Sequence, residues 1–297
     1  MLAKIDPAGI SAELARSMRD KSRARRVPRL VLALAGGLAL SLAVFLLTTD
    51  VPGSGQLPAR MGAALISLRQ AAGLGPTAPV QARSFSGTPA VGALFTSTGT
   101  GLGKHFCTAS VIDSPHGDLA LTAAHCVTGI AAARMAFVPG YHAGRAPYGV
   151  WAVTRVILDS RWISSAAPDD DFAFLVVKSP AHGGLQHITG GDRLGVAQPA
   201  GPMVQVVGYP DGASAPIICK NRAHLFSTSQ LEFDCGGYAD GTSGSPLLAN
   251  VSPSTGLGTV VGVIGGYEQG GYTSDVSYAA RFGARTAALY KMAISKS

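Results

Sequence analysis

The sequence is poor in charged residues. Asp, Glu, Lys and Arg make up 14% of its 297 residues, whereas hydrophobic residues make up 47%. This composition excludes a highly charged, disordered chain and is rich enough to build a sizeable core. The length allows one large domain or two small ones. The 38 glycines suit a fold of many short strands and tight turns.

A basic surface for nucleic acid is also lacking, although the net charge is +7. Eight Lys and Arg residues and three acidic residues fall within residues 1–29, a net charge of +5 that leaves +2 for the other 268 residues. The basicity therefore belongs mostly to a short N-terminal tail. We expect no nucleic-acid partner.

Long apolar runs are missing except for residues 30–47, which carry no charge. A helix of this length spans roughly 27 Å, close to the hydrocarbon thickness of a bilayer. Basic residues flank only its N-terminal side, which predicts a cytoplasmic tail at 1–29 and an extracytoplasmic remainder. The run is either a transmembrane signal anchor or a signal peptide cut after Ser41-Leu42-Ala43. The anchor is favoured because apolar residues continue past that site; cleavage would give a secreted protein.

Cysteine is scarce, and the four cysteines all lie beyond residue 100: Cys107, Cys126, Cys219 and Cys235. No C-x-x-C occurs, and the cysteine and histidine spacings match no zinc site, so we expect no metal and no other cofactor. An exported domain lies in an oxidising compartment, where four cysteines allow three pairings. The sequential pairing closes two short loops, each worth about 3 kcal/mol of stability.

The apolar runs change character along the chain. Residues 48–84 are rich in Pro, Gly and Ala and are predicted to be a linker, in which 57–72 form a short helix that is either part of the linker or packed on the next domain. From residue 85 on, short runs between turns predict β-strands arranged as barrels or a sandwich. These runs are residues 91–95, 108–112, 119–122, 151–158, 172–177, 203–209, 231–234, 246–249 and 259–265. Only residues 275–293 show a helical periodicity.

No histidine follows Ser243, the central serine of G-T-S-G-S-P at residues 241–246. A serine becomes a nucleophile when an imidazole, itself oriented by a carboxylate, takes its proton. All seven histidines precede Ser243, which excludes the Ser–acid–His order of α/β-hydrolases. The remaining common order is His, Asp, Ser. Taken alone, the motif is better explained as an ordinary glycine-rich turn, because turn serines are far commoner than nucleophiles.

Three motifs occur in that order: T-A-A-H-C at 122–126, D-F-A-F-L at 171–175 and G-T-S-G-S-P at 241–246. Together they resemble the chymotrypsin-like (trypsin-like) serine peptidases, and the third is most similar to bacterial secreted forms with S-G-S-P. The resemblance covers about residues 85–293. It implies an all-β fold of two antiparallel six-stranded β-barrels with the site between them, here followed by a C-terminal helix.

The resemblance also implies roles for four residues. His125 corresponds to the general base, Asp171 to the acid that orients it, and Ser243 to the nucleophile. The backbone N–H groups of Gly241 and Ser243 correspond to the oxyanion hole. The implied activity is that of a serine endopeptidase whose partner is a polypeptide substrate. Two alternatives remain: a catalytically silent homologue that binds peptides, and an esterase that uses the same triad.

Three aspartates are adjacent at the second motif. Asp171 directly precedes the apolar run and fits the family pattern, which selects it as the acid. Asp169 and Asp170 are expected to be solvated turn residues, so that Asp170→Asn should hardly change turnover.

The family commonly bridges a cysteine before the histidine to the one after it, which implies Cys107–Cys126. The second pair, Cys219–Cys235, rests on proximity in the sequence alone. The predicted peptidase domain spans residues 85–297.

Two positions depart from the family. Thr242 stands where members activated by proteolysis have an aspartate that binds the new N-terminus, so we expect no such salt bridge. Gly237 stands where members specific for basic residues have an aspartate, so we expect no preference for Lys or Arg. The run at 262–267 should line the substrate channel, with Gly265 and Gly266 leaving it open.

Overall fold

The structure is a computed structural model that describes residues 80–98, 101–179, 183–199 and 201–297. The chain divides into two compact units, Met1–Gly75 and Pro76–Ser297, and the described residues all belong to the second. The predicted tail, the apolar run 30–47 and the helix at 57–72 lie outside the described residues. Within the described ranges, no helix is long and apolar enough to cross a membrane.

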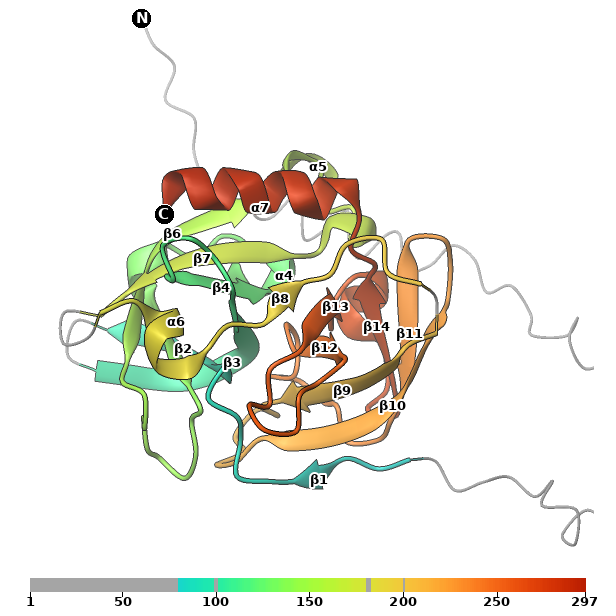
Figure 1. The fold of residues 1–297 in the computed structure, drawn as a ribbon, viewed down its shortest axis with the longest axis horizontal. Helices are drawn as coiled ribbons and strands as arrows, with labels where there is room; N and C mark the ends of the chain where they lie inside the picture. Colours follow the sequence, from blue (N-terminus) through green and yellow to red (C-terminus); the bar gives the residue numbers. More distant parts are fainter. Residues whose placement is uncertain (1–79, 99–100, 180–182, 200) are drawn as a thin grey trace, which may run out of the picture. The chain divides into compact units, whose positions relative to one another are not determined.

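The first half of the described chain forms a closed antiparallel barrel (Figure 1). Its strands follow one another around the barrel in the order β2-β3-β4-β7-β6-β5. They are β2 (Val91–Thr98), β3 (Gly101–Ile112), β4 (Leu119–Thr122), β5 (Met135–Pro139), β6 (Trp151–Leu158) and β7 (Ala173–Lys178). Every residue of β4 is buried, as expected for a strand covered on both faces.

The second half forms a sheet whose six central strands run in the order β14-β11-β10-β9-β12-β13. These strands are β9 (Met203–Gly208), β10 (Ile217–Leu225), β11 (Gln230–Asp234), β12 (Pro246–Ala249), β13 (Thr259–Val263) and β14 (Val276–Ala280). A bridge between Ile264 and Ala279 joins the end of β13 to β14, and so brings the two edges together. The prediction of two six-stranded barrels is confirmed.

Two short strands extend the second sheet. β8 (Arg193–Leu194) pairs in parallel with β13, so this sheet is not purely antiparallel. β1 (Arg83–Ser84) pairs antiparallel with β10, and Gly236 exchanges backbone hydrogen bonds of 2.8 Å with Val80 and Ala82 on either side of Gln81. The last residues of the predicted linker are therefore part of the second barrel.

The barrels share one core. A single hydrophobic cluster includes Phe174 of β7 and Leu121 of β4 together with Val207 of β9 and Val260 of β13. Because protein interiors are close-packed, this shared cluster fixes one barrel against the other. Loops of both barrels consequently meet at a defined place.

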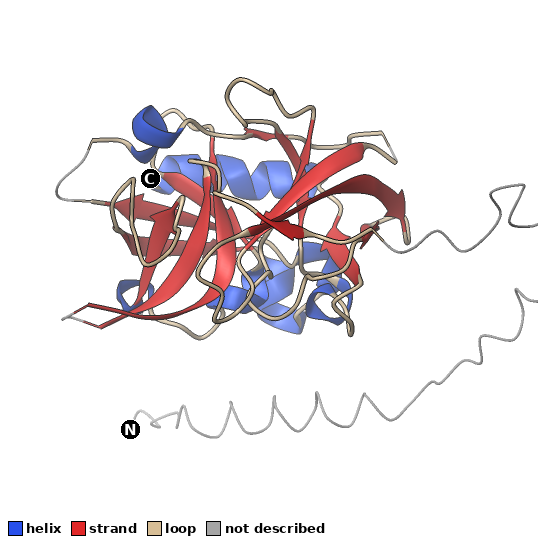
Figure 2. Ribbon diagram, turned by 90° about the horizontal axis from the view of Figure 1, so that it is seen from below, coloured by secondary structure: helices blue, strands red, loops and turns tan. Residues whose placement is uncertain are grey.

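Helices are short except at the C-terminus, and strands and loops make up most of the described chain (Figure 2). The helices are α4 (Ala124–Val127), α5 (Ser160–Ser165), α6 (Leu185–Thr189) and α7 (Ala284–Lys296), with 3-10 turns η1 (Ala132–Arg134), η2 (Pro168–Asp170) and η3 (Tyr267–Gly270). α7 packs along β6 and β7 of the first barrel (Figure 1).

The helix predicted over 275–293 is wrong in its first part. Residues 276–280 form β14, which pairs with β11 through Tyr278 opposite Glu232, and the helix begins only at Ala284. A short strand directly before an amphipathic helix extends the apparent helical periodicity, which explains the error. Gly283, which precedes the helix, marks the real boundary.

Both predicted disulfides are present. Cys107–Cys126 joins β3 to α4. Cys219–Cys235 joins β10 to the residue after β11. Each barrel therefore carries one covalent link between neighbouring segments.

Candidate active site

His125 lies in α4, a single helical turn that follows β4. The residues beside it, Ala124 and Cys126, are buried and hold the turn on the barrel, while His125 is partly exposed. Cys126 is tied to β3 by the first disulfide. The short turn and the covalent link place the imidazole at the rim of the first barrel.

Asp171 lies at the centre of a tight turn between η2 and β7. Its φ of −77° and ψ of 62°, with Phe172 N–H donating to Asp170 O at 2.8 Å, are those of an inverse γ-turn. The side chain is fully buried. The turn therefore points one carboxylate into the interior beside α4.

The Asp171 carboxylate accepts three hydrogen bonds. Oδ1 accepts from the backbone N–H of His125 at 2.9 Å. Oδ2 accepts from His125 Nδ1 at 2.7 Å and from Gly266 N–H at 2.8 Å. A carboxylate acceptor at Nδ1 makes this nitrogen the protonated one and leaves Nε2 free to accept a proton. The carboxylate fixes both the tautomer and the orientation of the imidazole.

Ser243 belongs to a segment of the second barrel that glycine allows to turn sharply. Gly241 and Gly244 have φ values of +89° and +83°, which other residues rarely adopt. A Cβ on Gly244 would collide with Thr108 O and Thr122 Oγ1. The segment carrying Ser243 therefore lies directly against the strands that lead to His125.

Thr108 joins the segment of Ser243 to the histidine side of the site. Its N–H donates to Ser243 O at 2.8 Å, and its Oγ1 donates to Gly241 O at 3.1 Å. Its own carbonyl accepts from Thr122 Oγ1 at 2.7 Å. Sequence reasoning missed this residue, and its place directly after Cys107 was the only signal for it.

The four backbone N–H groups of residues 241–244 differ in their pairing: two have acceptors in the described part of the chain and two have none. Thr242 N–H donates to Ala239 O at 3.1 Å, and Gly244 N–H donates to Ile264 O at 2.7 Å. Among the described residues, by contrast, the N–H groups of Gly241 and Ser243 have no acceptor. Backbone donors beside a cavity are paired by water or by a ligand.

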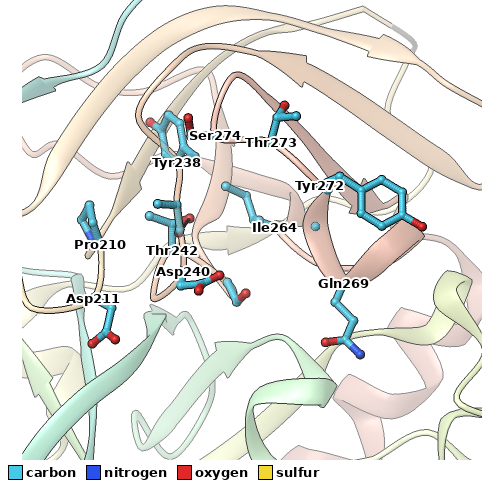
Figure 3. Close-up of a pocket in the computed structure, with 14 residues that line it drawn as sticks. Pro210, Asp211, Tyr238, Asp240, Thr242, Ile264, Gln269, Tyr272, Thr273 and Ser274 are labelled. Atoms are coloured by element: carbon cyan, nitrogen blue, oxygen red, sulfur yellow. Dashed lines mark hydrogen bonds between the residues drawn. The ribbon is translucent and has the colours of Figure 1, made fainter. Parts of the chain in front are cut away.

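A cavity of about 440 Å³ opens beside Ser243 (Figure 3). Its lining residues are Pro210, Asp211, Tyr238, Ala239, Asp240, Thr242, Ser243, Ile264, Gln269, Gly270, Gly271, Tyr272, Thr273 and Ser274. In Figure 3, Asp211 lies on one side of the cavity, and Gln269 and Tyr272 lie on the other. A hydrogen bond to Glu268 raises the pKa of Tyr272 to about 12. A volume of this size falls within the range of ligand-binding pockets.

Gly265 and Gly266, which were predicted to leave the substrate channel open, lie beside Asp171 and are not among the residues that line this cavity. Ile264 lines the cavity, but Gly266 donates its N–H to Asp171. A Cβ on Gly265 would lie 2.9 Å from Asp171 Oδ2. These two glycines allow the second barrel to approach the Asp171 carboxylate of the first, which the motif alone did not indicate.

The expectation that Asp169 and Asp170 are solvated is wrong for Asp170. Its side chain is only 2% exposed and forms an ion pair with Arg285 at 2.9 Å. Asp169 is half-buried and accepts from Gln230 Nε2 at 2.8 Å. The error arose because the partners lie far away in the sequence.

One group of possible metal ligands occurs in the described part of the chain: Cys107, His125 and Cys126, whose ligand atoms lie within 4.8 Å of one another. The two sulfur atoms are bonded to each other. Since a metal binds the thiolate and not the disulfide, this group is a disulfide beside the imidazole.

Comparison with known proteins defines the class. The family model for trypsin matches residues 77–283. The chain therefore belongs to the trypsin family and is a chymotrypsin-like serine endopeptidase, a hydrolase. No curated protein sequence matches the chain at a significant level.

Solved structures share the fold. The protease Anisep from Arthrobacter nicotinovorans is 23% identical with a TM-score of 0.61, over 72% of this chain and 99% of that one. The thermostable serine protease AL20 from an extremophilic microorganism is 23% identical with a TM-score of 0.59, over 71% and 99%. A Glu endopeptidase is 18% identical with a TM-score of 0.56, over 73% and 97%.

Proposed function

We propose that the protein cleaves peptide bonds with Ser243 as nucleophile, His125 as general base and Asp171 as the orienting acid. The observation that carries this proposal is the pair of hydrogen bonds between Asp171 and His125. They join Oδ2 to Nδ1 at 2.7 Å and Oδ1 to the backbone N–H at 2.9 Å. The segment of Ser243 supports it, because this segment is hydrogen-bonded to the same barrel through Thr108.

In the proposed acylation, Ser243 Oγ attacks the carbonyl carbon of the scissile bond while its proton passes to His125 Nε2. Asp171 stabilises the imidazolium that forms. The N–H groups of Gly241 and Ser243 donate hydrogen bonds to the carbonyl oxygen as it becomes negatively charged. Each such donor stabilises the transition state by about 3 kcal/mol. His125 then gives the proton to the leaving amine, the C–N bond breaks, and an acyl ester remains on Ser243.

In deacylation, water takes the place of Ser243 as the nucleophile, and Ser243 becomes the leaving group. A water molecule attacks the ester while its proton passes to His125 Nε2. The tetrahedral intermediate collapses, the proton returns to Ser243 Oγ, and a carboxylic acid product leaves. The same groups serve both half-reactions, so no further acid or base is needed.

The site supports a domain that needs no activation cleavage. Thr242, which stands in place of the aspartate that binds a new N-terminus, is buried, and its Oγ1 donates to Ala239 O at 2.6 Å. A threonine hydroxyl offers no negative charge to an ammonium group. We expect the full chain to be active and trimming near Arg83 not to raise its activity; a chain that becomes active only after trimming would contradict this expectation.

We also propose that the domain acts on the extracytoplasmic side, anchored through residues 30–47 or released after cleavage there. Two disulfides support an oxidising compartment. Digestion of the catalytic domain by an external protease in cells with an intact cytoplasmic membrane would support this location. Protection of the domain in such cells would contradict it.

A peptide library tests the proposed activity. The full chain is incubated with the library, and cleavage sites are read by mass spectrometry, with Ser243→Ala as the matched control. We expect cleavage by the wild type alone. Binding without cleavage would indicate the catalytically silent homologue, and turnover of esters only would indicate the esterase.

A further inference from the structure

Of the two residues that flank the proposed acid, one contacts the beginning of α7 and the other contacts the segment that leads into α7. Asp170 Oδ1 accepts a hydrogen bond from Arg285 Nε at 2.9 Å. The ring of Phe172 packs edge-on against Phe282, with centroids 5.6 Å apart. Asp171 therefore sits in a γ-turn whose two ends are held by the C-terminal helix and the residue that leads into it.

Arg285 also binds a second carboxylate. Its Nη2 is paired with Asp159 Oδ1, and Asp159 caps α5 by accepting from Arg161 N–H at 2.8 Å. Arg161 Nε lies 3.3 Å from Asp170 Oδ2. A guanidinium can bridge two carboxylates because its donors form a rigid planar fork. Arg285 thus links α7, the start of α5 and the turn of the acid.

The charges around Asp170 make this link important. Burial raises the pKa of Asp170, the negative charge of Asp159 raises it further, and Arg161 and Arg285 oppose both effects. Without Arg285, two largely buried carboxylates would face each other with Arg161 as their remaining partner. Like charges repel in a low-dielectric site, so the turn would relax away from its present position.

We propose that Arg285 is a positioning residue that holds Asp171 against His125 from the C-terminal helix. This inference rests on the proposed function of the triad. The carboxylate must keep donors at 2.7 Å, 2.8 Å and 2.9 Å at once. A displacement of about 1 Å in a catalytic geometry can cost on the order of 100-fold in rate.

A matched control is offered by a second arginine that contacts the same helix. Arg155 of β6 donates from Nη1 to Lys296 O at 2.8 Å, and so attaches the far end of α7 to the first barrel without contact to the acid turn. We expect Arg155→Gln to remove one contact of the helix, as Arg285→Gln does, but to leave Asp170 paired. The difference between the two variants isolates the positioning effect from helix docking.

The test compares Arg285→Gln, Arg285→Lys and Arg155→Gln in the full chain in detergent. We expect Arg285→Gln to lower kcat about 10-fold or more with KM within about two-fold, while Arg155→Gln changes neither. Arg285→Lys should give an intermediate kcat, because an ammonium lacks the fork that spans both carboxylates. The downfield proton NMR signal of His125 Nδ1–H should move or broaden in Arg285→Gln only.

Equal kcat values for Arg285→Gln and Arg155→Gln would overturn the proposal and reduce Arg285 to a docking contact. If Arg285→Gln does not fold, an Arg285→Lys variant with wild-type kcat and NMR signal would overturn it as well. A wild type without turnover would contradict the proposed function instead. The NMR signal still tests Arg285 in that case, because it reports the hydrogen bond directly.

Discussion

The two barrels build their parts of the proposed site in different ways. The first barrel presents His125 and Asp171 from short turns next to strands, fixed by a disulfide and by side-chain hydrogen bonds. The second presents Ser243 and the cavity from backbone that glycine makes possible, with positive φ at Gly241 and Gly244. Side-chain chemistry therefore dominates in one barrel and backbone shape in the other.

The difference predicts how each barrel responds to mutation. In the first barrel, an isosteric change that keeps the fold should remove activity by altering one functional group. In the second barrel, a single added methyl group should be enough to remove activity, because the proposed function there depends on the path of the backbone itself. Two single substitutions and the replacement of each disulfide test this contrast, and Asp192→Asn tests the junction between the barrels, from the largest expected effect to the smallest.

Asp171→Asn tests the first barrel. The amide cannot support the tautomer of His125 that leaves Nε2 free, so we expect kcat to fall roughly 10⁴-fold with little change in stability. Steady-state kinetics with a cleaved peptide measure this. Asp169→Asn is the control, because the Asp169 carboxylate accepts from Gln230 Nε2 and not from His125. An equal loss in both variants would contradict the assignment of the acid.

Gly244→Ala tests the second barrel. The new Cβ would meet Thr108 O and Thr122 Oγ1 at a φ of +83°, so Ser243 must shift and we expect kcat to fall about 100-fold or more. Gly212→Ala is the control, since Gly212 has a φ of +69° and open space around it. If Gly212→Ala is equally inactive, backbone strain alone accounts for the loss.

The disulfides allow the same comparison between barrels. Their cysteines are separated by 19 and 16 residues, so replacing either pair by serine should cost about 3 kcal/mol in denaturant unfolding. Only loss of Cys107–Cys126 should also lower kcat, because Cys126 adjoins His125. Equal effects of both pairs on kcat would show that the first bond has no special bearing on the imidazole.

Asp192 tests the junction between the barrels. It is fully buried. Its backbone N–H donates to Val111 O of β3 and its carbonyl accepts from Asp113 N–H just after β3, both at 2.9 Å. Its Oδ1 accepts from Gly258 N–H at 2.7 Å in the second barrel. Burial raises its pKa from 3.8 to about 7, opposed only in part by that hydrogen bond. Between pH 3.8 and about pH 7, the folded state thus keeps a proton that the unfolded state has lost. The free energy of unfolding therefore falls as the pH rises through this range.

Asp192→Asn removes this linkage. Relative to the wild type, the variant should gain about 2 kcal/mol in free energy of unfolding between pH 5 and pH 6.5, measured by urea denaturation at each pH. Below the ordinary pKa of an aspartate, the difference between the two proteins should become constant. A difference independent of pH across the whole range would contradict a protonated Asp192.

Local signals made much of this architecture predictable. Nine strands were located by their apolar runs, and β4, β6 and β12 agree with the predicted bounds residue for residue. The motifs around His125, Asp171 and Ser243 were found because each belongs to one short turn. Such features depend on neighbouring residues, which sequence patterns record directly.

Features made by distant residues were not predictable in this way. β10 was missed because three basic side chains interrupt its apolar residues, and β5 because Pro139 ends so short a run. Asp170 and its partner Arg285 are 115 residues apart in the sequence. Thr108 and Gly241, which are also hydrogen-bonded, are 133 residues apart. Only the packing of the barrels creates these pairs.

Active-site labelling tests the central claim most directly. The full chain and its His125→Ala variant are treated with a fluorophosphonate, and the modified peptide is identified by mass spectrometry. The account predicts one adduct per molecule on Ser243 in the wild type and labelling at least about 100-fold slower in the variant. An adduct on another serine such as Ser245, or labelling that is independent of His125, would contradict it.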